Sequence, residues 1–305
     1  MKVRFAVSVA GGPPDPDALV ATVTDLEVHG FDTLWVSDLS VLPATDPFLA
    51  VTTAAAVTTR LKLGVNIVPF GYPPFVFARQ VAQLDHLCGG RLLLTLVPGL
   101  DLPGERAALG IGRRHRGRLL DATIPVLRDL WAGRSVRLGP DGWPVPAPGA
   151  DDEDGSVELA LPTRPVQDPL EVWLGGSGPE AIDRAGRLAD GWLGALMPVD
   201  EAIARKAQIE LVASGAGRTI DPEHFGLSLA YARQPHELDR APRLRRRGQA
   251  PLAPLVPIGA GALRGTLGRL IDGGLSKFVV RPVAPVDDWH DELAWLADTI
   301  LDLQT

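Results

Sequence analysis

The stretch LGGSGPEAIDRAGRLADGW, residues 174–192, contains the local pattern that decides the fold. An apolar segment runs into the glycine-rich sequence GGSGP, which is followed by a helical pattern and then by a second apolar segment. We therefore expect a strand, a helix over residues 179–188 and a further strand over residues 191–196 in direct succession. Strands joined by a helix in this way are parallel, because the helix carries the chain back to the starting edge of the sheet.

The same rhythm extends outward in both directions along the chain. Strands are predicted over residues 3–9, 33–37, 61–67, 91–97, 171–174, 191–196, 225–232 and 277–281, and helices over residues 16–29, 46–59, 74–87, 113–131, 179–188, 200–213, 262–272 and 286–303. Asp46 is expected to cap the second helix, and Pro125 to kink or break the fourth. The strands are apolar throughout, which is typical of parallel strands buried on both faces. Eight strand–helix units in 305 residues predict an α/β fold, a single (β/α)8 TIM barrel, and a doubly wound sheet is the alternative.

Residues 133–169 interrupt this rhythm. The segment is rich in Pro, Gly and Asp, with GPDGWPVPAPGADDEDG (139–155) at its centre. It follows the fourth unit, so we expect an insertion with one hairpin in a single domain that spans residues 1–305.

Polar residues follow two of the predicted strands at their carboxyl ends, where TIM barrels carry their chemistry. Asp38 follows the second strand, and Asn66 closes the third just before a proline-rich loop. Both side chains are candidates for the barrel mouth. The alternative for Asp38 is a capping or loop hydrogen bond, and the alternative for Asn66 is ordinary turn formation.

The glycine-rich loop is the strongest candidate for binding an anion. Gly176, Ser177 and Gly178 precede a helix, so their backbone N–H groups can approach a phosphate. The alternative is a capping box of Ser177 and Glu180, and the Glu180 carboxylate would repel a phosphate. The pattern Gly176-x-Gly178-x-x-Ala181 fits a dinucleotide fingerprint only loosely, because the acidic residue expected after the next strand is missing.

Composition excludes several classes of protein. A net charge of −7 argues against a nucleic-acid partner, which requires basic surface. The single cysteine, Cys88, excludes an intramolecular disulfide and a Cys-based zinc site, and the histidines lack the spacing of a catalytic zinc site, so no metal is expected. No apolar run spans a membrane and the N-terminus does not resemble a signal peptide, which predicts a cytoplasmic location. The basic sequence RRHRGR (113–118) indicates either a solvated helix start or contact with a cofactor tail.

Seven stretches, taken together, resemble the luciferase-like monooxygenase superfamily. They are GFDTLWVSD (30–38), DPFLAVTTAAAVTTRLKLG (46–64), PPFVFARQVAQLDHLCGGRLLL (73–94), RGRLLDATIPVLRDLWAG (116–133), RPVQDPLEVWLGG (164–176), AGRLADGW (185–192) and GALRGTLGRLIDGGLSKFVVRP (261–282). This superfamily includes bacterial luciferase-like flavin enzymes and oxidoreductases that use the deazaflavin coenzyme F-420. The resemblance implies a (β/α)8 barrel with a flavin or deazaflavin in its mouth.

The resemblance also implies which residues contact the cofactor. Asn66 and Ile67 match a pair that often forms a non-prolyl cis peptide behind the flavin ring, and Gly99 matches a glycine after the fourth strand. The phosphate loop maps to Gly176, Ser177, Gly178 and Pro179, and the cofactor tail to Ala195, Leu196 and Met197. Three positions depart from the family pattern: Leu39 replaces a histidine, the fourth strand ends in TLVPG (95–99), and Asp121 replaces a glutamate.

The function implied is hydride transfer between coenzyme F-420 and a small organic substrate, with Asp38 as the catalytic residue that orients the substrate or relays a proton. One alternative is an FMN-dependent monooxygenase that uses O₂ and a separate flavin reductase. Another, prompted by Leu39 and the altered fourth strand, is a barrel that binds a flavin or other ligand without turnover. The family resemblance further implies a homodimer.

Overall fold

The computed structural model describes residues 1–9, 15–100, 102–145, 155–241 and 253–305. Eight parallel strands close into a barrel in the order β1-β10-β9-β8-β7-β4-β3-β2. These strands are β1 (Arg4–Ser8), β2 (Thr33–Ser37), β3 (Lys62–Ile67), β4 (Leu92–Leu96), β7 (Val172–Gly175), β8 (Gly191–Ala195), β9 (Phe225–Tyr231) and β10 (Lys277–Pro282). The (β/α)8 barrel is confirmed, and the closed strand order excludes the doubly wound sheet.

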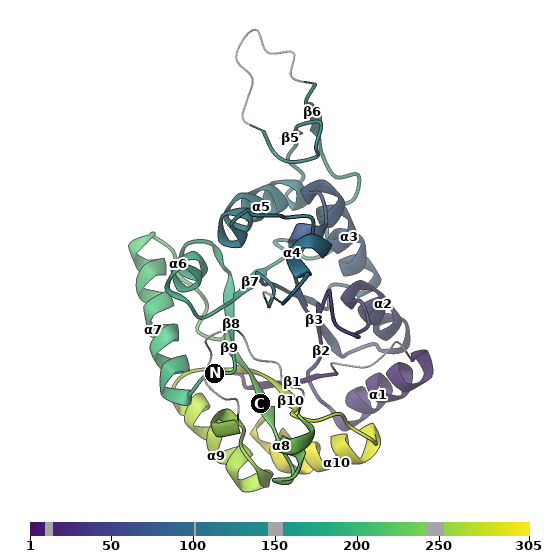
Figure 1. Cartoon of the computed structure of the whole chain (residues 1–305), viewed down its shortest axis with the longest axis vertical. Coiled ribbons are helices and arrows are strands. Elements are labelled where there is room, and N and C mark those ends of the chain that lie inside the picture. Colours follow the sequence, from purple (N-terminus) through teal and green to yellow (C-terminus); the bar gives the residue numbers. More distant parts are fainter. Residues whose placement is uncertain (10–14, 101, 146–154, 242–252) are drawn as a thin grey trace.

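Helices surround the barrel on the outside, as Figure 1 shows. They are α1 (Pro16–His29), α2 (Pro47–Val57), α3 (Pro74–Leu87), α4 (Glu105–Ala108), α5 (Arg116–Trp131), α6 (Pro179–Leu188), α7 (Val199–Gly215), α8 (Glu237–Arg240), α9 (Gly259–Asp272) and α10 (Trp289–Ile300), with 3-10 turns η1 (Pro69–Gly71), η2 (Ala253–Leu255) and η3 (Leu301–Leu303). The short helices α4 and α8 give no clear sequence signal, because one turn is too short to show a helical period.

Side chains alternate between the barrel interior and the layer beneath the helices. The interior cluster consists of Ala6, Trp35, Trp173, Leu193 and Val279, with Leu93 packed against it. Two glycines make room for the large rings. A Cβ at Gly64 would lie 2.1 Å from the Trp35 ring, and one at Gly191 would lie 2.4 Å from the Trp173 ring. The barrel is therefore filled by side chains below its mouth.

A two-stranded antiparallel sheet lies between α5 and β7 in the sequence. It pairs β5 (Val136–Leu138) with β6 (Val157–Leu159). In Figure 1 this hairpin projects away from the barrel beyond α3 and α5. The sequence-predicted insertion at 133–169 includes these strands, and its residues 146–154 lie outside the described ranges.

Three local predictions can be compared with the structure. Asp46 caps α2, because its side chain accepts hydrogen bonds from the backbone N–H groups of Phe48 and Leu49, as expected. Helix α5 begins at Arg116 rather than at residue 113 and continues through Pro125, so of the expected kink or break the break does not occur. The apolar face of α5 supplies Leu120, Ile124, Leu127 and Leu130 to the core, and this packing holds the helix together where proline removes one hydrogen bond.

None of the helices in the described ranges combines the length and apolar composition needed to cross a membrane.

Candidate active site at the barrel mouth

The polar floor of the barrel mouth follows from strand register. Ser37 pairs with Asn66, and Ser228 pairs with Val279 of the interior cluster. Arg281 lies two residues beyond Val279 on β10, so alternation places its side chain on the same interior face. Ser37, Asn66, Ser228 and Arg281 are all partly accessible. The mouth therefore presents two hydroxyls, an amide and a guanidinium.

Asp38 lies directly after β2 and is fixed to β3. Its backbone N–H donates to the Asn66 carbonyl at 2.8 Å, and its carboxylate accepts from the Val68 N–H at 3.2 Å and the Ser40 hydroxyl at 2.7 Å. Burial raises the pKa of Asp38, and the two carboxylate hydrogen bonds partly oppose this shift. The loop hydrogen bonds that were the alternative for Asp38 are thus present. Its carboxyl group also lies beside the mouth with a raised pKa, so the same residue remains a candidate for the site.

Asn66 ends β3 with an incompletely bonded amide. Its Nδ2 donates to the Ser37 hydroxyl at 3.0 Å, whereas its Oδ1 and the Oγ1 of Thr95, its register partner on β4, are buried without a partner in the described part of the chain. Buried polar atoms of this kind call for a water or ligand partner. Asn66 therefore has one acceptor available at the mouth.

Ile67 does not reach the mouth with its side chain. It is 1% exposed and packs in the main core between the barrel and the helices. The Asn66–Ile67 peptide bond is trans, because Asp168–Pro169 is the only cis bond in the described ranges. The resemblance left the state of this bond open, and the structure has it in the trans form.

The carboxyl end of β4 rests on a buried ion pair. Glu105 and Arg116 are 3% and 8% exposed, and their side chains pair at 2.8 Å. Arg116 also donates to the Pro98 carbonyl at 2.7 Å, and Glu105 accepts from the Leu100 N–H at 3.1 Å. Gly99 has a φ of +85°, and a Cβ there would lie 2.7 Å from the Arg116 guanidinium. Gly99 thus lets the loop close over the ion pair.

The glycine-rich loop lies between β7 and α6. Gly176 has a φ of +113° and its carbonyl accepts from the Trp192 indole N–H at 2.9 Å. Helix α6 begins at Pro179 with Gly178 as its cap and without a side-chain capping bond, so the alternative of a capping box at Ser177 is excluded. The backbone N–H groups of Ser177, Gly178 and Glu180 have no acceptor among the described residues. Three donors at a helix N-terminus are therefore available to an anion.

The three residues predicted to follow the cofactor tail point in different directions. Ala195 is exposed at the end of β8. Leu196 has a φ of +50°, which is rare for a branched side chain and marks local strain at the mouth. Met197 is 9% exposed and packs in the main core. The structure thus places Ala195 and Leu196 near the mouth, whereas the Met197 side chain is covered.

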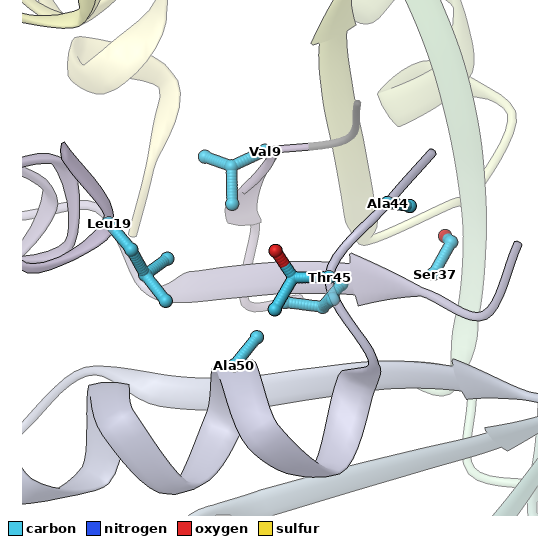
Figure 2. A pocket seen from close by; sticks show the side chains of 7 residues that line it. Val9, Leu19, Ser37, Ala44, Thr45 and Ala50 are labelled. Carbon is cyan, nitrogen blue, oxygen red and sulfur yellow. The ribbon is translucent and has the colours of Figure 1, made fainter. Parts of the chain in front are cut away.

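Two hollows accompany the site. A cavity of about 30 Å³ lies between the ends of β1 and β2 and helices α1 and α2, and Figure 2 shows Val9, Leu19, Ser37, Ala44, Thr45 and Ala50 around it. It has room for a water molecule and not for an aromatic ring. An open hollow of about 460 Å³ lies beside the glycine-rich loop, lined by His115, Arg118, Asp121, Pro179, Glu180, Asp183, Arg184 and Arg187. Within the described ranges, no group of three or more His, Cys, Asp or Glu side chains is placed to hold a metal ion.

Sequence reasoning missed two features of the site. Arg116, from the basic sequence at 113–118, is buried against Glu105 rather than solvated, and no sequence signal paired it with a residue of the irregular 98–110 segment. Arg281 was placed at a strand end but not recognised as a site residue. Its signal is present in the sequence, because a charged residue that closes an apolar parallel strand lies at the barrel mouth.

A closed parallel barrel with polar and glycine-rich strand ends gathered at one mouth defines a TIM-barrel protein with a candidate active site in the usual place. Residues 2–247 match the family model of the luciferase-like monooxygenases. The chain therefore belongs to the luciferase-like monooxygenase family, as its sequence resemblance predicted.

Individual relatives support this assignment. The chain is 29% identical over 223 residues to the 5,10-methylenetetrahydromethanopterin reductase of Methanolobus tindarius, covering 72% of this chain and 62% of the relative. It is 27% identical over 204 residues to the F-420-dependent glucose-6-phosphate dehydrogenase of Nakamurella multipartita, covering 63% of this chain and 56% of the relative. The matches thus span less than two thirds of either relative.

A solved structure of an F-420-dependent secondary alcohol dehydrogenase with an F-420–acetone adduct superposes with a TM-score of 0.77, at 15% identity and full coverage of both chains. At this identity the likeness concerns the fold alone.

Proposed function

We propose that this protein is an oxidoreductase that transfers a hydride between coenzyme F-420 and a small organic substrate bound in the barrel mouth. One observation carries the proposal: three unpaired backbone N–H groups at the start of α6 share a barrel mouth with the unpaired Asn66 Oδ1. The two features suit a ligand that has a phosphate at one end and a hydrogen-bonding ring at the other.

The residues present fit such a cofactor. The N–H groups of Ser177, Gly178 and Glu180 would hold its phosphate, and Asn66 Oδ1 would accept a hydrogen bond from its ring. The Glu180 carboxylate is exposed and lies 3.6 Å from the His115 ring, which would offset part of its repulsion of a phosphate when the ring is protonated. In the hollow beside the loop, Arg118 would contact an acidic tail, because Arg184 and Arg187 are paired with Asp121 and Asp183. When bound, the deazaflavin supplies a ring carbon that takes up or gives off a hydride.

The chain's own residues would position the substrate and manage a proton. Asp38 would orient the substrate or relay a proton, because it lies beside the mouth and burial raises its pKa toward the working range of a general acid. Leu39 occupies the position of the family histidine, so no imidazole shares this task. The Glu105–Arg116 pair would hold the β4 end in place.

Coenzyme F-420 is preferred over FMN because of the relatives. The Nakamurella relative is named for its dependence on F-420 and shares 27% identity with this chain. We also propose that the protein works in the cytoplasm as a homodimer, which size-exclusion chromatography with light scattering would test.

Fluorescence titration of the purified protein with F-420 and with FMN tests the proposal. We expect micromolar binding of F-420 and no binding of FMN. Binding of FMN alone, with O₂ consumption when a flavin reductase is added, would instead make the protein a flavin monooxygenase. If neither cofactor binds, both enzyme proposals fail and a barrel for another ligand remains.

A loop variant sharpens this test. Gly178→Asp places a carboxylate where the phosphate would bind, and an added Cβ at Gly178 meets nothing within 4 Å. We expect at least a tenfold weaker affinity for F-420 with unchanged folding. Gly261→Asp, at an equally open glycine in the first turn of α9, is the matched control and should bind F-420 normally.

A further inference from the structure

Arg281, on β10, directs its guanidinium group into the barrel mouth. On β10, Val279 belongs to the interior cluster and Lys277 lies over the Trp173 ring at 5.5 Å from its centroid. Alternate residues of a strand share a face, so Arg281 continues this interior row at the carboxyl end of the strand. Its register partner on β9 is Ala230, which is too short to interact with the guanidinium head.

Arg281 is half-buried and has no counter-ion. Across the described ranges, the guanidinium has no hydrogen bond and no ion pair. Burial alone lowers the pKa of Arg281, with no contribution from any carboxylate. Holding a half-buried charge without a partner lowers stability, and no contact within the described ranges gives Arg281 a structural role.

The position of β10 separates Arg281 from the candidate cofactor residues. Asn66, Gly99 and the loop at residues 176–179 follow β3, β4 and β7, which are neighbours in the barrel. In the ring of eight strands, β10 lies directly opposite β4. Arg281 therefore lies across the mouth from the residues that would hold the cofactor, on the side that remains for a substrate.

We propose that Arg281 is the anchor for an oxyanion group of the substrate, so that the substrate class is a small organic molecule bearing a carboxylate or a phosphate. This rests on the proposed function. The planar guanidinium offers paired N–H donors that match two oxygens of either group, and this fixes the substrate in one orientation. The neighbouring Ser228 hydroxyl, on the same interior face, is a further donor for the same group.

Anion titrations of wild type and Arg281→Gln test this assignment. The probes are inorganic phosphate and acetate, added with and without bound F-420 at low ionic strength and followed by calorimetry and thermal unfolding. We expect at least a tenfold loss of phosphate affinity in Arg281→Gln and an F-420 affinity within twofold of wild type. Arg281→Lys should be intermediate, because it keeps the charge and loses the paired donors. Arg79→Gln, at an exposed arginine on α3, controls for the change in net charge.

Each other outcome overturns the assignment. If Arg281→Gln weakens F-420 binding tenfold, the oxyanion belongs to the cofactor. If neither anion binds wild type, or if the variant binds them equally well, Arg281 is not an anion anchor. Arg281→Gln should also raise the unfolding temperature, whereas a lower one would indicate a structural role. The anions are also titrated without cofactor. A failure of F-420 to bind would therefore contradict the proposed function without deciding whether Arg281 binds an anion.

Discussion

At the scale of single residues, the barrel contains charged groups at both ends and apolar rings between them. Lys277 lies at the closed end, buried over the Trp173 ring, and burial lowers its pKa to about 8 despite the favourable Asp32 carboxylate. Arg281 and Asp38 lie at the mouth. Residues at the closed end of a TIM barrel contribute to stability, whereas residues at its mouth contribute to binding and catalysis.

Asp38→Asn should retain F-420 binding within about twofold and reduce turnover by about 10²–10⁴, the usual contribution of a general acid or base. Because burial raises the pKa of Asp38, the acid limb of the wild-type pH–rate profile should lie above the ordinary pKa of aspartate and should disappear in the variant. F-420 reduction by a panel of small alcohols and acids, measured from pH 4 to 9, checks this. Unchanged turnover with intact binding would remove Asp38 from the mechanism.

Lys277→Met should raise the free energy of unfolding by about 1–3 kcal/mol at pH 7, because it removes a buried charge. The folded-state pKa of about 8 lies below the value of 10.5 for an unfolded chain. The unfolded state therefore binds more protons between these values, and the penalty is full below pH 8 and fades as the pH rises to 10.5. Urea unfolding at pH 7 and pH 10 should show the advantage of the variant shrinking. Lys2→Met, at the exposed N-terminus, should show no such change.

At the scale of elements, glycines decide how closely the helices approach one another. Gly186 of α6 is buried, and a Cβ there would lie 2.5 Å from Val212 of α7, whereas a Cβ at Gly265 of α9 meets nothing within 4 Å. The same substitution should therefore have opposite effects in the two helices.

Gly186→Ala should lower the free energy of unfolding by about 1–3 kcal/mol through overpacking, and Gly265→Ala should raise it by about 0.5–1 kcal/mol through helix propensity. Denaturant unfolding of both variants measures this directly. Equal effects of the two would mean that α6 and α7 do not pack as closely as the structure has them.

At the scale of the whole molecule, the last residues close the barrel against the first strand. Gln304 accepts a hydrogen bond from the Phe5 N–H at 3.1 Å and donates to the Gly30 carbonyl at 2.9 Å. Thr305 bonds to Val3 through its hydroxyl at 3.0 Å and through its backbone N–H at 3.2 Å. These contacts join elements about 300 residues apart in sequence.

Gln304→Ala should reduce the free energy of unfolding by about 1–2 kcal/mol, because it leaves the part-buried Phe5 N–H unpaired and removes the exposed bond to Gly30. The same measurement on Gln208→Ala, an exposed residue of α7, should show a change below about 0.5 kcal/mol. Hydrogen exchange at Phe5 should also accelerate in Gln304→Ala. An unaltered exchange rate there would show that this closure is unimportant.

The sequence by itself determined the eight parallel strands, the succession of helices and the family. Apolar strands and helix starts such as Asp46 are local signals, and the order of the seven matching stretches is carried by the chain itself. It also placed Asp38, Asn66 and the glycine-rich loop at strand ends, because the side of a barrel on which a strand ends follows from chain direction.

Only the tertiary structure decided which of those residues face the mouth and how they are bonded. The burial of Ile67 and Met197, the Glu105–Arg116 pair and the isolation of Arg281 all depend on contacts between distant segments. The sequence left open the state of the Asn66–Ile67 bond and the capping of α6, and the structure shows a trans bond and a helix start without a side-chain cap. The physical reason is that the register and packing between elements set the direction of each side chain and its charge partners. A single sequence does not show which residues of distant elements come into contact.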